Sequence, residues 1–155
     1  MRSLTLVAIA ALAACSDTPD AAPQMTFDGA LNSMPVGVNT HGDRLAWVLG
    51  CRGCHGEDLQ GKIWDNDPKG YGVMWASNLT RVLPAITDEQ LTILLQVGKH
   101  PSREEMWVMP SELFQHLSLA DTRALVAYLR TVRPAGKPSP RPLLGPRAKR
   151  EIASG

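Results

Sequence analysis

The sequence lacks several features that would point to common classes of protein. Its 155 residues carry a formal net charge of only +1, so it has no excess of Lys and Arg of the kind that binds a nucleic-acid backbone. We find no internal repeat, and no run of residues alternates between apolar and polar side chains for long enough to predict a strand. A chain of this length with 44% hydrophobic residues can bury the core of one small domain.

Long apolar runs are also missing. The apolar stretch from Leu4 to Ala14 is too short to span a bilayer. It follows Met1-Arg2-Ser3, and a charged start before a short apolar stretch is typical of a secretory signal peptide. We therefore predict a signal peptide over residues 1–14, and hence export.

The end of this stretch, Leu12-Ala13-Ala14-Cys15, resembles the lipobox of bacterial lipoproteins. The resemblance implies that Cys15 receives lipid and becomes the mature N-terminus. Several acyl chains would then hold the protein stably on the periplasmic side of a bacterial membrane, and Ser16 after the Cys slightly favours the outer membrane. The alternative is an ordinary cleavage site, with Cys15 an incidental thiol.

Composition divides the mature chain into three parts. Residues 15–39 are rich in Ala, Pro, Gly and Asp without apolar periodicity, which predicts a flexible tether with no packed structure. Residues 134–155 hold five Pro residues and five basic residues against one Glu, giving this tail a charge of +4 and the remainder −3. These prolines predict an extended tail without regular helix. The domain itself is expected over residues 40–133.

Within the domain, capping and spacing signals predict three main helices. The first begins with Thr40 as its cap and runs into Cys51. The second begins with a capping box of Thr87 and Gln90 and stops at Gly98. The third is capped by Ser118 and stops before Pro134. The expected fold class is a small all-α domain of three main helices with long loops over residues 56–86 and 99–117.

Cysteine is scarce, and two of the three Cys residues lie together in Cys51-Arg52-Gly53-Cys54-His55. This is the C-x-x-C-H motif of covalent haem attachment. Two thiols at this spacing reach the two vinyl groups on one edge of a porphyrin, and the adjacent imidazole then lies under the iron. The motif therefore predicts one covalently bound haem c, held by Cys51 and Cys54 with His55 as an iron ligand.

Three alternatives to haem attachment exist for the two cysteines. A thioredoxin-like redox pair expects a βαβ surround, which the pattern lacks. A zinc site needs further ligands, but there is no second Cys pair, and the remaining His residues show no regular ligand spacing. A structural disulfide is permitted in an exported chain but leaves the adjacent His unexplained.

Taken together, the chain resembles the class I cytochromes c, and more loosely the single-haem cytochromes and cytochrome subunits that serve periplasmic dehydrogenases. The resemblance covers about Gly42 to Thr131. It rests on the haem motif and the order of three weaker features: Asn78-Leu79-Thr80, Met109-Pro110 and Leu125-Val126-Ala127-Tyr128-Leu129.

This resemblance implies a sixth iron ligand from a Met in the loop before the last helix, which places Met109 at the iron. Met106 is the rival, and His100 or His116 would give ligation by two His residues; an open site is the remaining alternative. The family also packs its first and last helices through a small residue and aromatics, for which Gly42, Trp47 and Tyr128 are candidates.

One family feature is missing from the sequence. Members commonly have a Pro whose carbonyl accepts the N–H of the iron-bound His. Here Ala76 and Ser77 precede Asn78, so the sequence does not name the acceptor. Trp64, Trp75 and Trp107 are assigned no role beyond packing.

A haem with both axial positions filled by protein exchanges electrons rather than binding substrate. The expected function is an electron carrier, not an enzyme, that accepts electrons from a dehydrogenase or another redox protein and passes them to a cytochrome or oxidase. The alternatives are a haem enzyme or gas sensor with an open sixth site, and a fixed subunit of a larger dehydrogenase complex. No nucleic-acid partner is expected, and the membrane is reached through the lipid rather than a transmembrane helix.

Overall fold

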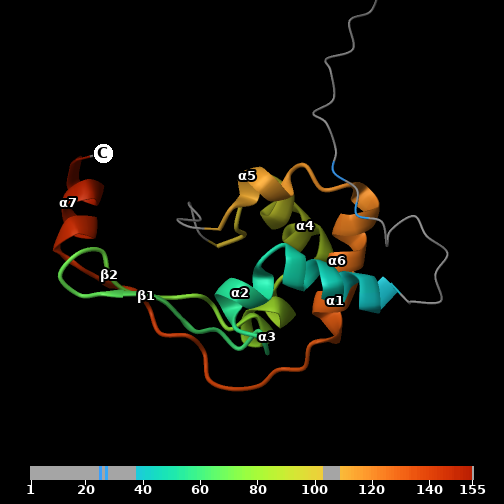
Figure 1. Ribbon diagram of the computed structural model, residues 1–155, viewed down its shortest axis with the longest axis horizontal. Coiled ribbons are helices and arrows are strands. Elements are labelled where there is room, and N and C mark those ends of the chain that lie inside the picture. Colours follow the sequence, from blue (N-terminus) through green and yellow to red (C-terminus); the bar gives the residue numbers. More distant parts are fainter. Residues whose placement is uncertain (1–24, 26, 28–37, 103–108, 155) are drawn as a thin grey trace, which may run out of the picture.

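The computed structural model describes Met25, Phe27 and residues 38–102 and 109–154. Its helices and strands are shown in Figure 1 and follow in chain order: α1 (Val38–Val48), α2 (Cys51–His55), β1 (Ile63–Asp67), β2 (Gly72–Trp75), α3 (Leu79–Val82), the 3₁₀ turn η2 (Leu83–Ala85), α4 (Asp88–Val97), α5 (Ser111–Phe114), α6 (Leu119–Thr131), β3 (Leu143–Leu144) and α7 (Pro146–Ser154). Most of the buried core lies on α1, α4 and α6, which confirms the predicted all-α class.

Helices α1 and α6 form the central pair. A Cβ atom placed on Gly42 would lie 2.2 Å from the carbonyl oxygen of Ala124 and 2.4 Å from Cβ of Tyr128. The two backbones therefore approach as closely as only Gly permits, and the expected role of Gly42 is confirmed. Leu45 of α1 and Leu125 of α6 are fully buried in the same hydrophobic core.

The capping signals of the second and third predicted helices are confirmed. The Thr87 hydroxyl accepts the Gln90 N–H at 3.1 Å, while the Gln90 side chain accepts the Thr87 N–H at 2.9 Å. Gly98 ends α4 in the left-handed region with φ of 72°. Ser118 caps α6 by accepting the Asp121 N–H at 3.1 Å.

The first helix departs from its prediction at both ends. It begins at Val38, so Thr40 lies inside the helix rather than capping it. It ends at Val48 instead of running into Cys51, because Gly50 adopts a left-handed conformation with φ of 79° and starts a separate helix, α2. The haem motif thus occupies a helix of its own.

The prediction that the domain has no strand is wrong. Strands β1, β2 and β3 form an antiparallel sheet in that order. They were missed because β1 is mostly exposed on both faces and gives no alternation, while β3 pairs only through Gly72–Leu144 and Val73–Leu143. The first predicted long loop also contains α3 and η2, and the second contains α5.

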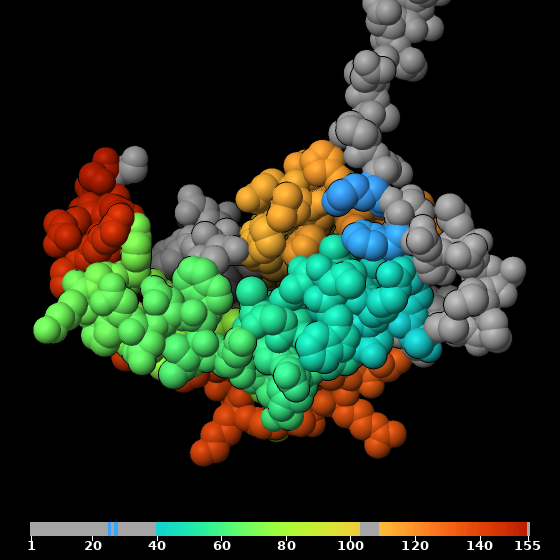
Figure 2. Space-filling model, in the orientation of Figure 1, coloured from blue at the N-terminus to red at the C-terminus, as the bar shows by residue number. Residues whose placement is uncertain are grey.

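The prediction for the basic tail is also wrong in its second half. After α6 the chain runs as a segment without helix or strand over residues 134–142, which we call the C-terminal strap. It passes beneath α3 to the sheet, where β3 and α7 follow (Figure 1). Pro146 opens α7 instead of preventing it, because the first turn of a helix needs no N–H from that residue. The sheet and α7 gather at one end of the molecule (Figure 2).

Two residues of the predicted tether contact the helical body. The Met25 N–H donates to the His116 carbonyl at 2.6 Å, and the Ser118 N–H donates to the Met25 carbonyl at 2.9 Å. The Phe27 N–H donates to the carboxylate of Asp121 at 2.9 Å. Packed structure is therefore present where the sequence predicted none, while the rest of residues 15–37, including Cys15, lies outside the described residues.

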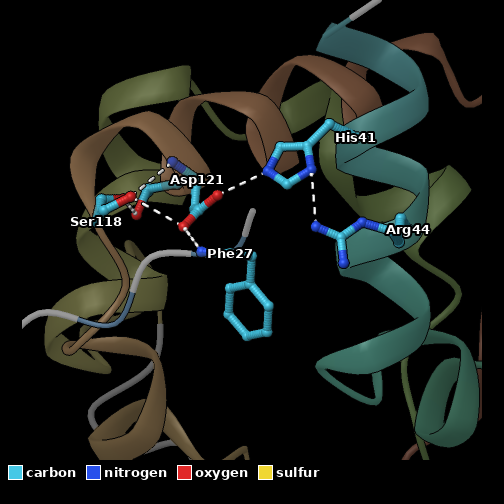
Figure 3. Close-up of polar contacts among 6 residues, drawn as sticks. Phe27, His41, Arg44, Ser118 and Asp121 are labelled. Carbon is cyan, nitrogen blue, oxygen red and sulfur yellow. Dashed lines mark hydrogen bonds and ion pairs between the residues drawn. The ribbon is translucent and has the colours of Figure 1, made fainter. Parts of the chain in front are cut away.

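The carboxylate that receives Phe27 is fully buried at the start of α6. His41 of α1 contacts it at 2.7 Å, and the Ser118 hydroxyl donates to it at 2.9 Å (Figure 3). Asp121 thereby joins α1, α6 and the N-terminal segment, and its desolvation is offset by these contacts.

None of the helices in the described residues is long and apolar enough to cross a membrane.

Candidate haem site

The predicted attachment residues share the single helix α2. Cys51 and Cys54 stand three residues apart, so they lie on neighbouring positions of one helical face. Cys51 is half-buried and packs against the hydrophobic core, whereas Cys54 is exposed. Burial raises the pKa of the Cys51 thiol to about 11, so this group is protonated near neutrality.

His55 is held by a backbone carbonyl. Its Nδ1 lies 2.8 Å from the carbonyl oxygen of Ser77. Since a carbonyl can only accept, Nδ1 carries the proton and the lone pair of Nε2 is left for a metal. Burial lowers the pKa of His55, and the bond to Ser77 opposes this only in part, which favours the neutral ring that ligates metals. Ser77 is the acceptor that the sequence could not name.

Arg52, between the two cysteines, fastens α2 to the central helix pair. Its guanidinium donates to the Asp43 carboxylate at 2.5 Å and to the Tyr128 hydroxyl. It also lies over two rings, 5.2 Å from the centroid of Trp47 and 5.6 Å from that of Tyr128. The bond to Arg52 is the main reason that the pKa of Asp43 lies below its usual value. We name Arg52 with Asp43, Trp47 and Tyr128 the arginine clamp.

The arginine clamp refines the expected packing of aromatics. Tyr128 packs against the core beside Gly42, as the resemblance implied. Trp47 is 51% exposed and contacts Arg52 rather than filling the interface between α1 and α6. Cation–π contacts of this kind contribute about 0.5–1 kcal/mol when exposed and about 2 kcal/mol when desolvated.

Met109 lies two residues before α5 and packs, half-buried, against the core. It lines a cleft of about 450 Å³ between the end of α4 and α5, together with Gly98, Ser111 and Glu112. Its carbonyl accepts the Ser111 N–H at 2.8 Å, which fixes the backbone at this point. The role of Met109 as sixth ligand stays a prediction.

The rival ligands are placed as follows. Met106 lies outside the described residues, as does Trp107. Nδ1 of His100 accepts the Ser102 N–H at 3.1 Å. His116 is half-buried, and its Nδ1 has no hydrogen-bond partner among the described residues.

The donor set fits haem c and fits no other cofactor that the sequence suggested. Two thiols on one helical face, followed at once by a neutral imidazole with a free Nε2, supply both attachment points and one iron ligand. In the described part of the chain, no three His, Cys, Asp or Glu side chains gather into a group that could hold a metal ion. A zinc site at Cys51 and Cys54 therefore lacks partners there.

Sequence reasoning missed three polar groups of the structure. The Ser77 carbonyl carries no side-chain signature, so no signal could have revealed it. The buried pair of His41 and Asp121 joins residues 80 positions apart, and spacing alone does not indicate such a contact. Asn78 belongs to a family feature of the sequence, but its almost complete burial beside the strap has no sequence signal.

Comparison with known proteins supports this interpretation. Residues 40–133 match the cytochrome c family. No curated protein and no solved structure matches the chain. Because the family match covers more than half of the chain, and its residues include the C-x-x-C-H motif and the His55 geometry, the chain belongs to the cytochrome c family of haem-binding electron-transfer proteins.

Proposed function

We propose that this protein is an exported electron carrier with one haem c, attached through Cys51 and Cys54, with His55 and Met109 as the axial ligands. Each thiol would form a thioether with one vinyl group, its sulfur bonding to one carbon and its proton passing to the other, so attachment would need no oxidant. Bound haem supplies a one-electron Fe(II)/Fe(III) couple. Substrate chemistry is not part of the proposal.

The observation that carries the proposal is the orientation of His55. The bond of 2.8 Å from its Nδ1 to the Ser77 carbonyl fixes the ring tautomer and leaves Nε2 as the ligating nitrogen. The same bond makes the ligand more basic, as carboxylates and carbonyls do behind metal-bound His residues generally. Neither an exposed motif nor a disulfide-forming pair of cysteines requires a neighbouring His whose Nδ1–H is bonded to a backbone carbonyl.

The sixth ligand decides between a carrier and an enzyme or gas sensor. A Met thioether raises the potential relative to a second imidazole, and it blocks access of small molecules to the iron. Met109 is favoured because it lies next to the core between α4 and α5. His116, with its unpartnered Nδ1 among the described residues, is the specific observation that supports ligation by two His residues.

Spectra of the reduced protein with carbon monoxide test the carrier. A six-coordinate iron responds weakly, whereas an open site shifts strongly. In the oxidised protein, Met109→Ala should abolish the weak sulfur-to-iron band at the red edge of the visible spectrum, and Met106→Ala should leave it intact. The reverse pattern moves the ligand to Met106. An unchanged band in both variants moves the sulfur ligand to another Met of the chain, and a parent protein without the band has no Met ligand.

We further propose that lipid on Cys15 anchors the protein to the periplasmic face of a bacterial membrane, with redox proteins such as dehydrogenases, oxidases or other cytochromes as partners. The support is the lipobox-like Leu12-Ala13-Ala14-Cys15 and the need of an electron carrier for a donor and an acceptor. The same features also fit a protein that is a fixed subunit of a larger complex.

Fractionation tests the anchor. Cys15→Ala should release the protein from membranes of a lipoprotein-competent host without altering its haem spectrum, since the cysteine and the haem motif belong to separate segments. Cys15→Ala protein that stays in the membrane pellet would show that something other than this cysteine holds it there.

A further inference from the structure

The C-terminal strap, residues 134–142, lies against the segment that carries the His55 acceptor. Asn78 Nδ2 donates to the carbonyl oxygens of Ala135 and Lys137, both at 2.9 Å. On the other side of Ser77, the Ser139 hydroxyl donates to the carbonyl of Ala76 at 2.8 Å. The residues immediately before and after Ser77 are therefore both bonded to the strap.

Further bonds extend this contact beyond Ser77. The Thr80 hydroxyl accepts the Ala135 N–H at 2.9 Å and lies 3.0 Å from the Ala135 carbonyl. Arg81 donates to the Gly136 carbonyl through Nε at 3.0 Å and Nη2 at 2.8 Å. Asn78 and Thr80 are each only 1% exposed, so the strap satisfies polar groups that water does not reach.

Close packing beside His55 leaves no space between the strap and the acceptor segment. The Gly61 N–H donates to the His55 carbonyl at 2.7 Å. A Cβ atom on Gly61 would lie 2.5 Å from the Ser139 hydroxyl oxygen and 2.7 Å from the Ala76 carbonyl oxygen. The turn after the haem motif, the acceptor segment and the strap thus meet at one point, and this contact requires Gly.

We propose that the strap is a positioning device for the iron ligand: through Asn78 and Ser139 it holds the Ser77 carbonyl in place to accept the Nδ1 proton of His55, and so sets the reduction potential. The inference rests on the proposed function, in which His55 binds the iron. A carbonyl held on Nδ1–H makes the imidazole a stronger donor, which stabilises Fe(III) and lowers the potential. Loosening the strap therefore raises it.

The test compares three variants of the full chain, matured in a host that attaches haem c. Asn78→Ala removes both donations from Asn78 to the strap, and Ser139→Ala removes one on the other side. Ser154→Ala is the matched control, because it deletes a hydroxyl that donates to a backbone carbonyl at 2.9 Å in α7, away from the strap. The measurements are the midpoint potential and the exchange rate of the His55 Nδ1 proton by NMR.

We expect a more positive potential and faster proton exchange in Asn78→Ala, a smaller change of the same sign in Ser139→Ala, and values of the parent protein in Ser154→Ala. If Asn78→Ala does not mature, the comparison of the potential and proton exchange of Ser139→Ala with those of Ser154→Ala decides alone. An unchanged or more negative potential in the strap variants overturns the inference, even if they unfold at lower temperature. A parent protein without haem would instead overturn the proposed function.

Discussion

The central helix pair and the three-stranded sheet with α7 differ in what holds them together. Helices α1 and α6 meet through Gly42 and bury Leu45 and Leu125 completely. The sheet is built from short strands with much exposed surface, and its last strand spans only two residues. The first region is fixed by apolar packing near the haem motif, and the second by backbone pairing that few buried side chains support. Changes in the first should therefore reach the haem site, whereas changes in the second should stay local.

The largest effect is expected from Cys51→Ser with Cys54→Ser. The double variant should carry no covalent haem and fold poorly, because a haem forms a large part of the core in so short a chain. Haem staining of denaturing gels measures the loss. Staining that survives both substitutions would refute the attachment residues.

The next effect concerns the helix pair itself. Gly42→Ala places a Cβ atom 2.2 Å from the Ala124 carbonyl oxygen, so the helices must separate, at a cost of about 1–3 kcal/mol of unfolding free energy. Denaturant unfolding of the holoprotein measures it. Gly53→Ala is the matched control, since a Cβ there has nothing within 4 Å. Equal stabilities of the two variants would mean that α1 and α6 are not tightly packed.

The arginine clamp links the pair to α2. Arg52→Gln removes a guanidinium that is only 16% exposed and leaves the Asp43 carboxylate without its partner. We expect a loss of about 1–3 kcal/mol and a lower yield of haem attachment, with thermal unfolding and haem content as measurements. A variant as stable and as fully loaded as Gly53→Ala would show that the clamp does not orient α2.

The smallest effect on the haem site should come from the sheet. In Gly145→Ala a Cβ atom would meet the Gly70 carbonyl oxygen at 2.3 Å, so β3 should separate from β2 at a cost of about 1 kcal/mol. Amide exchange should show lost protection in β2 with an unchanged haem spectrum. A changed haem spectrum would show that changes in the sheet also reach the haem site, as changes in the helix pair do.

The sequence could predict the features that depend on residues close together in the chain. The capping box of Thr87 and Gln90, the cap at Ser118 and the haem motif are local patterns, and each acts within a few residues. The match between Gly42 and Tyr128 followed from family resemblance. Thr40 misled because it has the chemistry of a cap but lies within the first turn of a helix that starts at Val38.

Other features depend on residues far apart in the chain. The strap bonds Asn78 to carbonyls nearly 60 positions away, and carbonyls are present at every residue, so composition carries no trace of the contact. Four of the five prolines of the tail lie in the strap and exclude helix there, whereas the fifth, Pro146, stands where a helix can begin. The Ser77 acceptor was hidden for the same reason as the strap.

The mass of the intact, denatured mature protein tests the central claim most directly. Covalent attachment through Cys51 and Cys54 predicts the mass of the processed polypeptide, with any lipid, plus that of one haem, and a haem-bearing peptide that spans the Cys51-Arg52-Gly53-Cys54-His55 motif. A peptide of unmodified mass, or one lighter by two hydrogens from a disulfide, would contradict it.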